Sequence, residues 1–284
     1  MRMREGFCGW YFKCQSEDES IALIPAVHTT GGQRTCSIQI LSAHGSLAAA
    51  LPGEHCHIWR DRPCAVLGGS LFSESGIRLD LHTDTVRAAG SLRFGAFSPL
   101  RYDIMGPFSL VPAMECRHSV ASMRHSVDGH LRINGRDFCF RDGVGYLEGD
   151  RGRSFPRRYA WTQCCFDGGS LMLAVADVPL GPVSFTGVLC VIQFQGREYR
   201  LATYLGARAA SIRDGTIVIR QAGLDFTAAL LDRQAHPLQA PIRGAMTRIV
   251  RENVSCRAFY RFRRDDRTLF AFVTPRAAFE YGYP

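Results

Sequence analysis

Short apolar or alternating runs, each bounded by turn residues, are the feature that most restricts the fold of this chain. Side chains of a strand alternate between two faces, so runs of four to eight such residues predict strands rather than helices. The clearest runs are Trp10–Cys14, Ile21–Val27, Cys36–Leu41, Ile77–Leu81, Phe108–Val111, Leu171–Val175, Val188–Phe194, Tyr199–Tyr204 and Thr216–Ile219.

The turns between many of these runs are explicit in the sequence. Gly, Asn and Asp accept the positive φ of tight hairpin turns, and such turns join antiparallel neighbours. The signals are Val127-Asp128-Gly129, Ile133-Asn134-Gly135, Arg141-Asp142-Gly143, Gln195-Gly196 and Arg213-Asp214-Gly215. Helical signals are weaker, because Ser46–Leu51 and Asp225–Arg233 fit strands equally well. We therefore predict a nearly all-β, antiparallel protein with few short helices.

The length indicates more than one sheet. In 284 residues this pattern gives about twenty strands, more than one eight-stranded barrel holds, so two barrels or sandwiches packed together fit better. The Gly- and Arg-rich passage from Gly149 to Arg158 divides the chain nearly in half and is the expected seam.

Hydropathy places the chain among globular proteins. Hydrophobic residues make up 46% of it, enough for a packed core, yet no run approaches the ~18 apolar residues of a membrane span. The start, Met1-Arg-Met-Arg-Glu-Gly, does not lead into a signal-peptide segment. A soluble, cytoplasmic protein is expected.

The charge is positive and nearly all of it is arginine. Lys and Arg number 34 against 26 acidic residues, a net +8, and Lys13 is the single lysine. One interpretation is a general bias toward arginine, and the other is recognition of phosphate or carboxylate by its forked donors. The Arg151–Arg158 and Arg261–Arg264 clusters interleave with aromatics, but Asp150, Asp265 and Asp266 offset them, which argues against nucleic acid as the partner.

The cysteines indicate a reducing compartment. Eleven cysteines lie scattered in apolar runs, an odd number that does not suggest a disulfide framework, and no C-x-x-C occurs. His55 and His57 would share one strand face, but such a pair is typical of a polar surface. We predict no metal site and no cofactor.

The residues from Gly145 to Gln163 are the most informative segment. They combine two carboxylates, four arginines, four aromatics and a proline in nineteen positions. Charged and aromatic residues in a loop between strands are typical of a functional site, although an interdomain linker with Arg–carboxylate pairs has the same composition.

Several motifs in order along the chain resemble the tocopherol cyclase family. The central signature is represented by Gly145, Tyr146, Glu148, Gly152, Phe155, Pro156, Arg157, Trp161 and Gln163. Gly9-Trp10-Tyr11-Phe12 is similar to the family's start, Met114–His118 to its Glu followed closely by a His, and His236–Pro241 to its Pro-Leu-x-Ala-Pro element.

The resemblance implies two lipocalin-like barrels, with an N-terminal domain over residues 1–150 and a C-terminal domain over 151–284. It also implies cofactor-free, acid-catalysed cyclisation of a prenylated quinol or a related isoprenoid or polyene. One departure is clear: the plant cyclases have Lys-Asn-Trp after the signature Glu, whereas this chain has Gly149-Asp150-Arg151. Tocopherol itself is therefore in doubt as the substrate.

Site residues follow from that chemistry and from the resemblance. Closing a chromanol ring needs a proton donor at the alkene, and a buried carboxylic acid can fill that role. Glu148 is the first candidate, with Asp103 or Glu115 as a second carboxylate, although ion pairing with arginine or histidine is the competing interpretation for each. The candidate substrate-binding residues are Tyr146, Phe155, Arg157, Trp161, Gln163 and His118.

An apolar small molecule is the expected partner, and two roles for the protein stay open. Besides an enzyme, the same barrel suits a non-catalytic carrier or sensor of an isoprenoid or other lipid, which needs an apolar lining and no acid. Peripheral contact with an anionic membrane is compatible with both roles and would use the same arginines.

Overall fold

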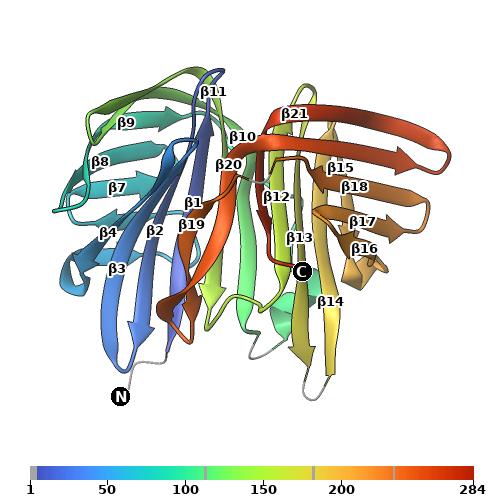
Figure 1. Cartoon of the computed structure of the whole chain (residues 1–284), viewed down its shortest axis with the longest axis horizontal. Helices are drawn as coiled ribbons and strands as arrows, with labels where there is room; N and C mark the ends of the chain where they lie inside the picture. The colour runs from blue at the N-terminus through green and yellow to red at the C-terminus, as the bar shows by residue number, and fades with distance from the viewer. Residues whose placement is uncertain (1–4, 112–113, 181–182, 233) are drawn as a thin grey trace. The chain divides into compact units, whose positions relative to one another are not determined.

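In the computed structural model, which describes residues 5–111, 114–180, 183–232 and 234–284, nearly all regular structure is strand (Figure 1). Three short 3₁₀ helices interrupt it, η1 (Gly53–His55), η2 (Gly106–Leu110) and η3 (Thr203–Leu205). The predicted all-β class is confirmed. In the part of the chain that is described, no helix reaches the length and hydrophobicity that a bilayer crossing requires.

The strands form two antiparallel sheets. The first, of eleven strands, has the order β4-β3-β2-β1-β11-β10-β9-β8-β7-β6-β5. Its strands are β1 (Gly6–Gln15), β2 (Ser20–Thr30), β3 (Gln33–Ser42), β4 (Gly45–Pro52), β5 (Cys56–Ile58), β6 (Ala65–Leu67), β7 (Ser70–Ser73), β8 (Gly76–His82), β9 (Arg87–Phe94), β10 (Cys116–Ile133) and β11 (Arg136–Gly152).

The second sheet has ten strands in the order β15-β14-β13-β12-β21-β20-β18-β17-β16, with β19 also paired to β20. Its strands are β12 (Tyr159–Phe166), β13 (Gly169–Leu180), β14 (Val183–Phe194), β15 (Arg197–Ala202), β16 (Arg208–Arg213), β17 (Thr216–Gln221), β18 (Leu224–Leu230), β19 (His236–Ile242), β20 (Ala245–Arg264) and β21 (Arg267–Tyr281).

Each sheet curls around a core of its own. In the first, Ala49 on β4 and Ile58 on β5, from opposite ends of the strand order, belong to one hydrophobic cluster. In the second, the Gln221 side chain at the end of β17 donates to the Arg200 carbonyl on β15 and accepts from the Ala202 amide, both at 3.1 Å. Inward side chains therefore fill a closed, barrel-like interior, as small barrels require.

The compact units are not continuous in sequence. The first comprises residues 1–103, 112–155 and 238–249, and the second 104–111, 156–237 and 250–284. The main passage from one unit to the other therefore lies between Phe155 and Pro156, inside the Gly149–Arg158 passage expected as the seam and a few residues after the predicted domain boundary at 150/151. Gln39 on β3 exchanges two hydrogen bonds with the Gln239 backbone on β19, at 2.8 and 3.0 Å, which fixes that late segment to the first sheet.

Three local predictions are wrong for identifiable reasons. Phe108–Val111 is not a strand, because Gly106–Leu110 forms η2 with a proline in its first turn, where the missing N–H is not needed. Asp128-Gly129 lies inside β10 and Asp142-Gly143 inside β11, so neither is a hairpin turn. Gly129 and Asp142 use their positive φ of 135° and 51° for irregularities in the ladder instead.

The core of the first unit gives a direct test of this packing. Leu147 on β11 has no exposed surface, and Leu147→Ala is expected to lower the free energy of unfolding by roughly 2–5 kcal/mol because a cavity remains. Leu71 on β7 is 37% exposed and is the matched control, expected to change stability by about 0.5 kcal/mol or less. Urea titration measures both, and equal losses would contradict the assigned core.

Candidate functional site

The signature segment lies on β11, where its residues alternate between two faces. Gly145, Leu147 and Gly149 share one face, and Leu147 belongs to the core of the first sheet. A Cβ at Gly145 would lie 2.2 Å from the His125 ring, and one at Gly149 would lie 2.5 Å from the Trp10 ring. The two glycines are therefore required because rings pack directly on the strand backbone.

The opposite face of β11 carries Tyr146, Glu148 and Asp150. Tyr146 is 1% exposed and Glu148 is 5% exposed, so this part of the sheet is buried on both faces. The pairing of β11 with β1 sets Glu148 opposite Tyr11, and its pairing with β10 sets Asp150 opposite His118. Register alone thus gathers polar side chains from three neighbouring strands on one buried surface.

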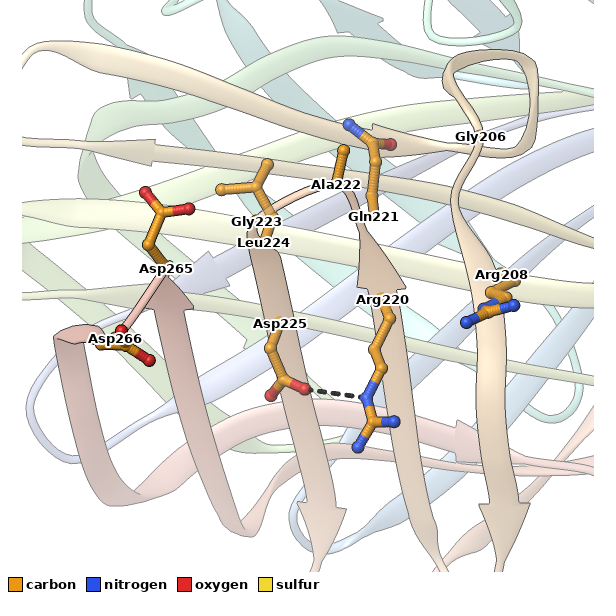
Figure 2. A pocket seen from close by; sticks show the side chains of 10 residues that line it. All are labelled: Gly206, Arg208, Arg220, Gln221, Ala222, Gly223, Leu224, Asp225, Asp265 and Asp266. Carbon is orange, nitrogen blue, oxygen red and sulfur yellow. Dashed lines mark hydrogen bonds and ion pairs between the residues drawn. The ribbon is translucent and has the colours of Figure 1, made fainter.

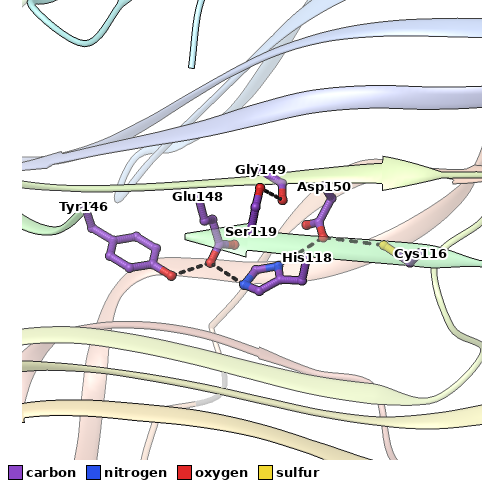
Figure 3. A network of polar contacts seen from close by, with 7 residues as sticks. All are labelled: Cys116, His118, Ser119, Tyr146, Glu148, Gly149 and Asp150. Atoms are coloured by element: carbon purple, nitrogen blue, oxygen red, sulfur yellow. Dashed lines mark hydrogen bonds and ion pairs between the residues drawn. The ribbon is translucent and has the colours of Figure 1, made fainter. Parts of the chain in front are cut away.

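These side chains form a continuous chain of polar contacts, which we call the Tyr–Glu–His–Asp network (Figure 3). The Tyr146 hydroxyl donates to Glu148 Oε2 at 2.5 Å. His118 Nε2 lies 3.3 Å from the same Oε2, at ion-pair distance but without hydrogen-bond geometry. On the other side of the ring, His118 Nδ1 lies 3.0 Å from Asp150 Oδ1.

Two further contacts lie at and beside the Asp150 end of the network. The Cys116 thiol donates to Asp150 Oδ1 at 3.4 Å, and the Ser119 hydroxyl donates to the Gly149 carbonyl at 2.9 Å (Figure 3). Burial, together with the negative charge of Asp150, raises the pKa of the Cys116 thiol well above its ordinary value. Cys116 is therefore a protonated donor here and not a thiolate nucleophile.

The imidazole of His118 is the group in the network that carries a positive charge. Burial by itself lowers the pKa of His118, but the negative charges of Glu148 and Asp150 outweigh burial and raise it well above its ordinary value. Burial and the charge of Glu148 also raise the pKa of the Tyr146 hydroxyl well above its usual range, so it stays an O–H donor. Two protons of the network, on the imidazole and on the Tyr146 hydroxyl, thus lie on a largely buried sheet face.

His118, Glu148 and Asp150 are also the described residues that could hold a metal ion, with ligand atoms within 4.8 Å of one another. The two carboxylates, however, contact opposite nitrogens of the His118 ring, Glu148 at Nε2 and Asp150 at Nδ1. A ligand set would instead point its donor atoms at one common position. The 3.0 Å contact instead lets Asp150 hold the ring, as the carboxylate of a catalytic triad does.

The structure brings together three of the nine residues selected from the sequence, namely Glu148, Tyr146 and His118. Asp103 and Glu115 are exposed, and the Glu115 carbonyl accepts the backbone amides of Arg153 and Ser154. Phe155 packs edge-on against Phe7, with ring centroids 5.3 Å apart.

The other three candidates belong to the second unit. Arg157 is exposed just before β12, whereas Trp161 and Gln163 are buried on that strand, on the face opposite the core of the second sheet. Trp161 lies opposite Glu280 of β21, and the Tyr159 hydroxyl donates to the Glu280 carboxylate. Neither Tyr159 nor Glu280 was selected from the sequence.

Asp150 is the network residue that sequence reasoning did not select. In the sequence it stood out as a departure from the plant signature and as an acid beside the arginines, and its place opposite His118 depends on the β10–β11 register. The signal that could have found it is the Tyr-x-Glu-x-Asp spacing, which puts three polar groups on one strand face.

An open pocket of about 470 Å³ lies at the hairpin ends of the second unit (Figure 2). Arg208, Arg220, Asp225, Asp265 and Asp266 supply its charges. Arg220 Nε already donates to Asp225 Oδ2 at 3.3 Å, so its charge is balanced within the protein. Its acids lie beside exposed arginines in an open pocket, so it is the weaker candidate for chemistry that needs an acid shielded from water.

Solved structures share the fold of this chain at low sequence identity. CghA in complex with Sch210972 aligns with a TM-score of 0.62 and 10% identity over 98% of this chain and 88% of its own. CghA in a second crystal structure gives 0.60 and 10% over the same shares. Kievitone hydratase from Nectria haematococca gives 0.58 and 8%, over 98% of this chain and 89% of its own. No protein-family model matches the sequence, and no curated protein matches it significantly.

The charge on His118 predicts a distinct pH dependence of stability. Since its folded-state pKa lies above the ordinary value of 6.5, its contribution to stability is complete below pH 6.5 and is lost as the pH rises through the folded-state value. The free energy of unfolding, measured by urea titration, should therefore fall more between pH 6 and pH 9 for the wild type than for His118→Gln.

The other buried histidines supply the internal control. Burial lowers the pKa of His28 and of His125 to about 4, so both rings are neutral at pH 6. In ¹⁵N-histidine NMR spectra at pH 7, His118 should give an imidazolium signal while His28 and His125 give neutral signals. A neutral His118 at that pH would contradict the assigned electrostatics.

Proposed function

We propose that this protein is a cofactor-free, acid-catalysed cyclase or isomerase of a prenylated quinol or a related isoprenoid or polyene. The buried Tyr–Glu–His–Asp network carries the proposal, because it couples an imidazolium to a carboxylate on a shielded sheet face. The motif resemblance to tocopherol cyclases supports it. So does a fold shared with a hydratase and with a protein crystallised with a small-molecule ligand.

The reaction needs a group that gives a proton and takes one back. In ring closure, the proton goes to an alkene carbon, the substrate hydroxyl oxygen bonds to the resulting cation, and the hydroxyl proton leaves. The substrate neither gains nor loses a proton overall. One carboxyl group can therefore serve as acid and then as base.

Glu148 is assigned that role, and His118 supplies its proton. The proton passes from His118 Nε2 to Glu148 once the 3.3 Å contact between them aligns as a hydrogen bond in the substrate complex, and from Glu148 to the alkene. The proton released by the hydroxyl returns to Glu148 and then to His118. Tyr146 holds the Glu148 carboxyl in place through its hydrogen bond.

Asp150 replaces Asp103 and Glu115 as the second carboxylate in this proposal. Both of those side chains are exposed, whereas Asp150 contacts His118 directly and stabilises the imidazolium. The substrate-binding roles of Phe155, Arg157, Trp161 and Gln163 stay predictions from the resemblance.

The decisive variant is Glu148→Gln, which keeps the side chain's size and removes its proton chemistry. With prenylated hydroquinones of several tail lengths, the wild type should form chromanols, and the variant should lose roughly 10²- to 10⁴-fold in kcat. Glu74→Gln, an exposed glutamate in the turn after β7, is the matched control and should keep full activity. Product is measured by liquid chromatography with mass spectrometry.

The outcomes separate the enzyme from the carrier. Undiminished turnover in Glu148→Gln would remove Glu148 from the mechanism. Tight binding of the hydroquinones by the wild type without chromanol at any tail length would favour the non-catalytic carrier or sensor. Loss of wild-type turnover on treatment with a metal chelator would favour a bound ion at His118, Glu148 and Asp150.

Asp150→Asn should shift the pH profile of catalysis. The active form carries a proton on His118, so the alkaline limb of kcat reports the pKa of that ring in the complex. Removing the Asp150 charge removes one cause of the raised pKa, and the limb should move to lower pH. An unchanged alkaline limb in the variant would show that His118 does not supply the proton.

A further inference from the structure

The single lysine of the chain is buried. Lys13 lies on β1 and is 2% exposed, which makes it the most buried charged residue in the part of the chain that is described. The other 33 basic residues are arginines. Lysine is almost never fully buried unless its charge is paired.

The register of β1 places Lys13 on the sheet face that carries the Tyr–Glu–His–Asp network. Trp10, Phe12 and Cys14 belong to the core cluster, so Lys13 lies on the opposite face of the strand. It is directly opposite Tyr146 of β11, and Tyr11, two residues earlier, is opposite Glu148. Lys13 and Glu148 are therefore diagonal neighbours across the ladder, a separation within the reach of long side chains.

The kind of cation at this position is informative. An ammonium is a compact charge with three rotatable donors, whereas a guanidinium is a wide planar fork. All the other basic residues of the chain are arginines, yet the position diagonal to the buried Glu148 is a lysine. Three donors also allow the ammonium to keep contacts within the protein while it donates to a ligand.

We propose that Lys13 is a substrate-binding residue of this site, whose ammonium donates a hydrogen bond to a free hydroxyl or enol oxygen at the polar end of the substrate. The inference rests on the proposed function and narrows its substrate class to isoprenoid-tailed phenols or enols with that oxygen uncapped. A nearby positive charge favours the ionised form of such a hydroxyl, which makes the oxygen a better nucleophile for ring closure. Lys13 forms no covalent bond and keeps its proton.

Because the chain has one lysine, each labelled side-chain nucleus of isotopically labelled lysine gives one NMR signal, and that signal reports Lys13 alone. The probes are a hydroquinone with a saturated alkyl tail, which binds without reacting, and the same compound with its hydroxyls methylated. Calorimetry establishes that each probe is bound. The ¹³Cε and ¹⁵Nζ signals should shift with the hydroquinone and shift much less with the ether.

Variants test the same contact kinetically. Lys13→Met should lower kcat/KM for the free hydroquinone roughly 10- to 100-fold, the range expected for one lost charge-assisted hydrogen bond. Lys13→Arg should restore part of the loss, since it keeps the charge. Arg93→Met, which removes an exposed cation from β9, should change nothing. Circular dichroism of each variant shows whether it is folded.

Failure of this inference is distinguishable from failure of the proposed function. If the wild type turns over substrate but the Lys13 signals do not shift when the hydroquinone binds, the role of Lys13 is overturned and the proposed cyclase function is not. Equal signal shifts with hydroquinone and ether overturn the selection for a free oxygen. Absence of both binding and turnover overturns the two proposals together. The NMR measurement uses the wild type, so it holds even where Lys13→Met does not fold.

Discussion

The pairing of β1 with β11 is the constraint on which the rest of the first unit depends. It joins the start of the chain to residues 129 to 145 positions later, from Gln15 opposite Val144 to Phe7 opposite Gly152. Where the two strands pair, both are largely buried on both faces, one face apolar and the other mainly polar. A slip of one residue would turn Glu148 into the hydrophobic core and Leu147 out of it, so register is strongly specified.

Much of the fold was predictable because its information is local. Asn134-Gly135 and Asp214-Gly215 have positive φ at both residues and form the hairpin turns that the sequence indicates. The same residue types at Asp128-Gly129 and Asp142-Gly143 serve bends inside long strands, because a positive φ fits a bulge as well as a turn. Local sequence cannot distinguish the two, since the difference lies in what the partner strand does.

The site was predictable only in part, for the same reason. Tyr146 and Glu148 share a strand face by spacing alone, and His118 came from the resemblance. Asp150 shares that face by the same spacing, but its place beside His118 depends on the β10–β11 register, and the place of Lys13 depends on the β1–β11 register, both of them long-range. Asp103, flanked by apolar residues in sequence, is exposed in a loop, because neighbours in sequence do not decide burial where no regular element imposes a periodicity.

The burial of Lys13 also means that chemical labelling of its amine can report local opening of the first sheet. Reagents that acylate side-chain amines find one target in this sequence, and it lies inside the sheet, next to the strand that carries the acid. The rate of such labelling therefore follows how often β1 separates from its neighbours. The acylation rate of Lys13 would thus report the local opening of β1, and a ligand that reaches the buried face through that opening would depend on the same motion.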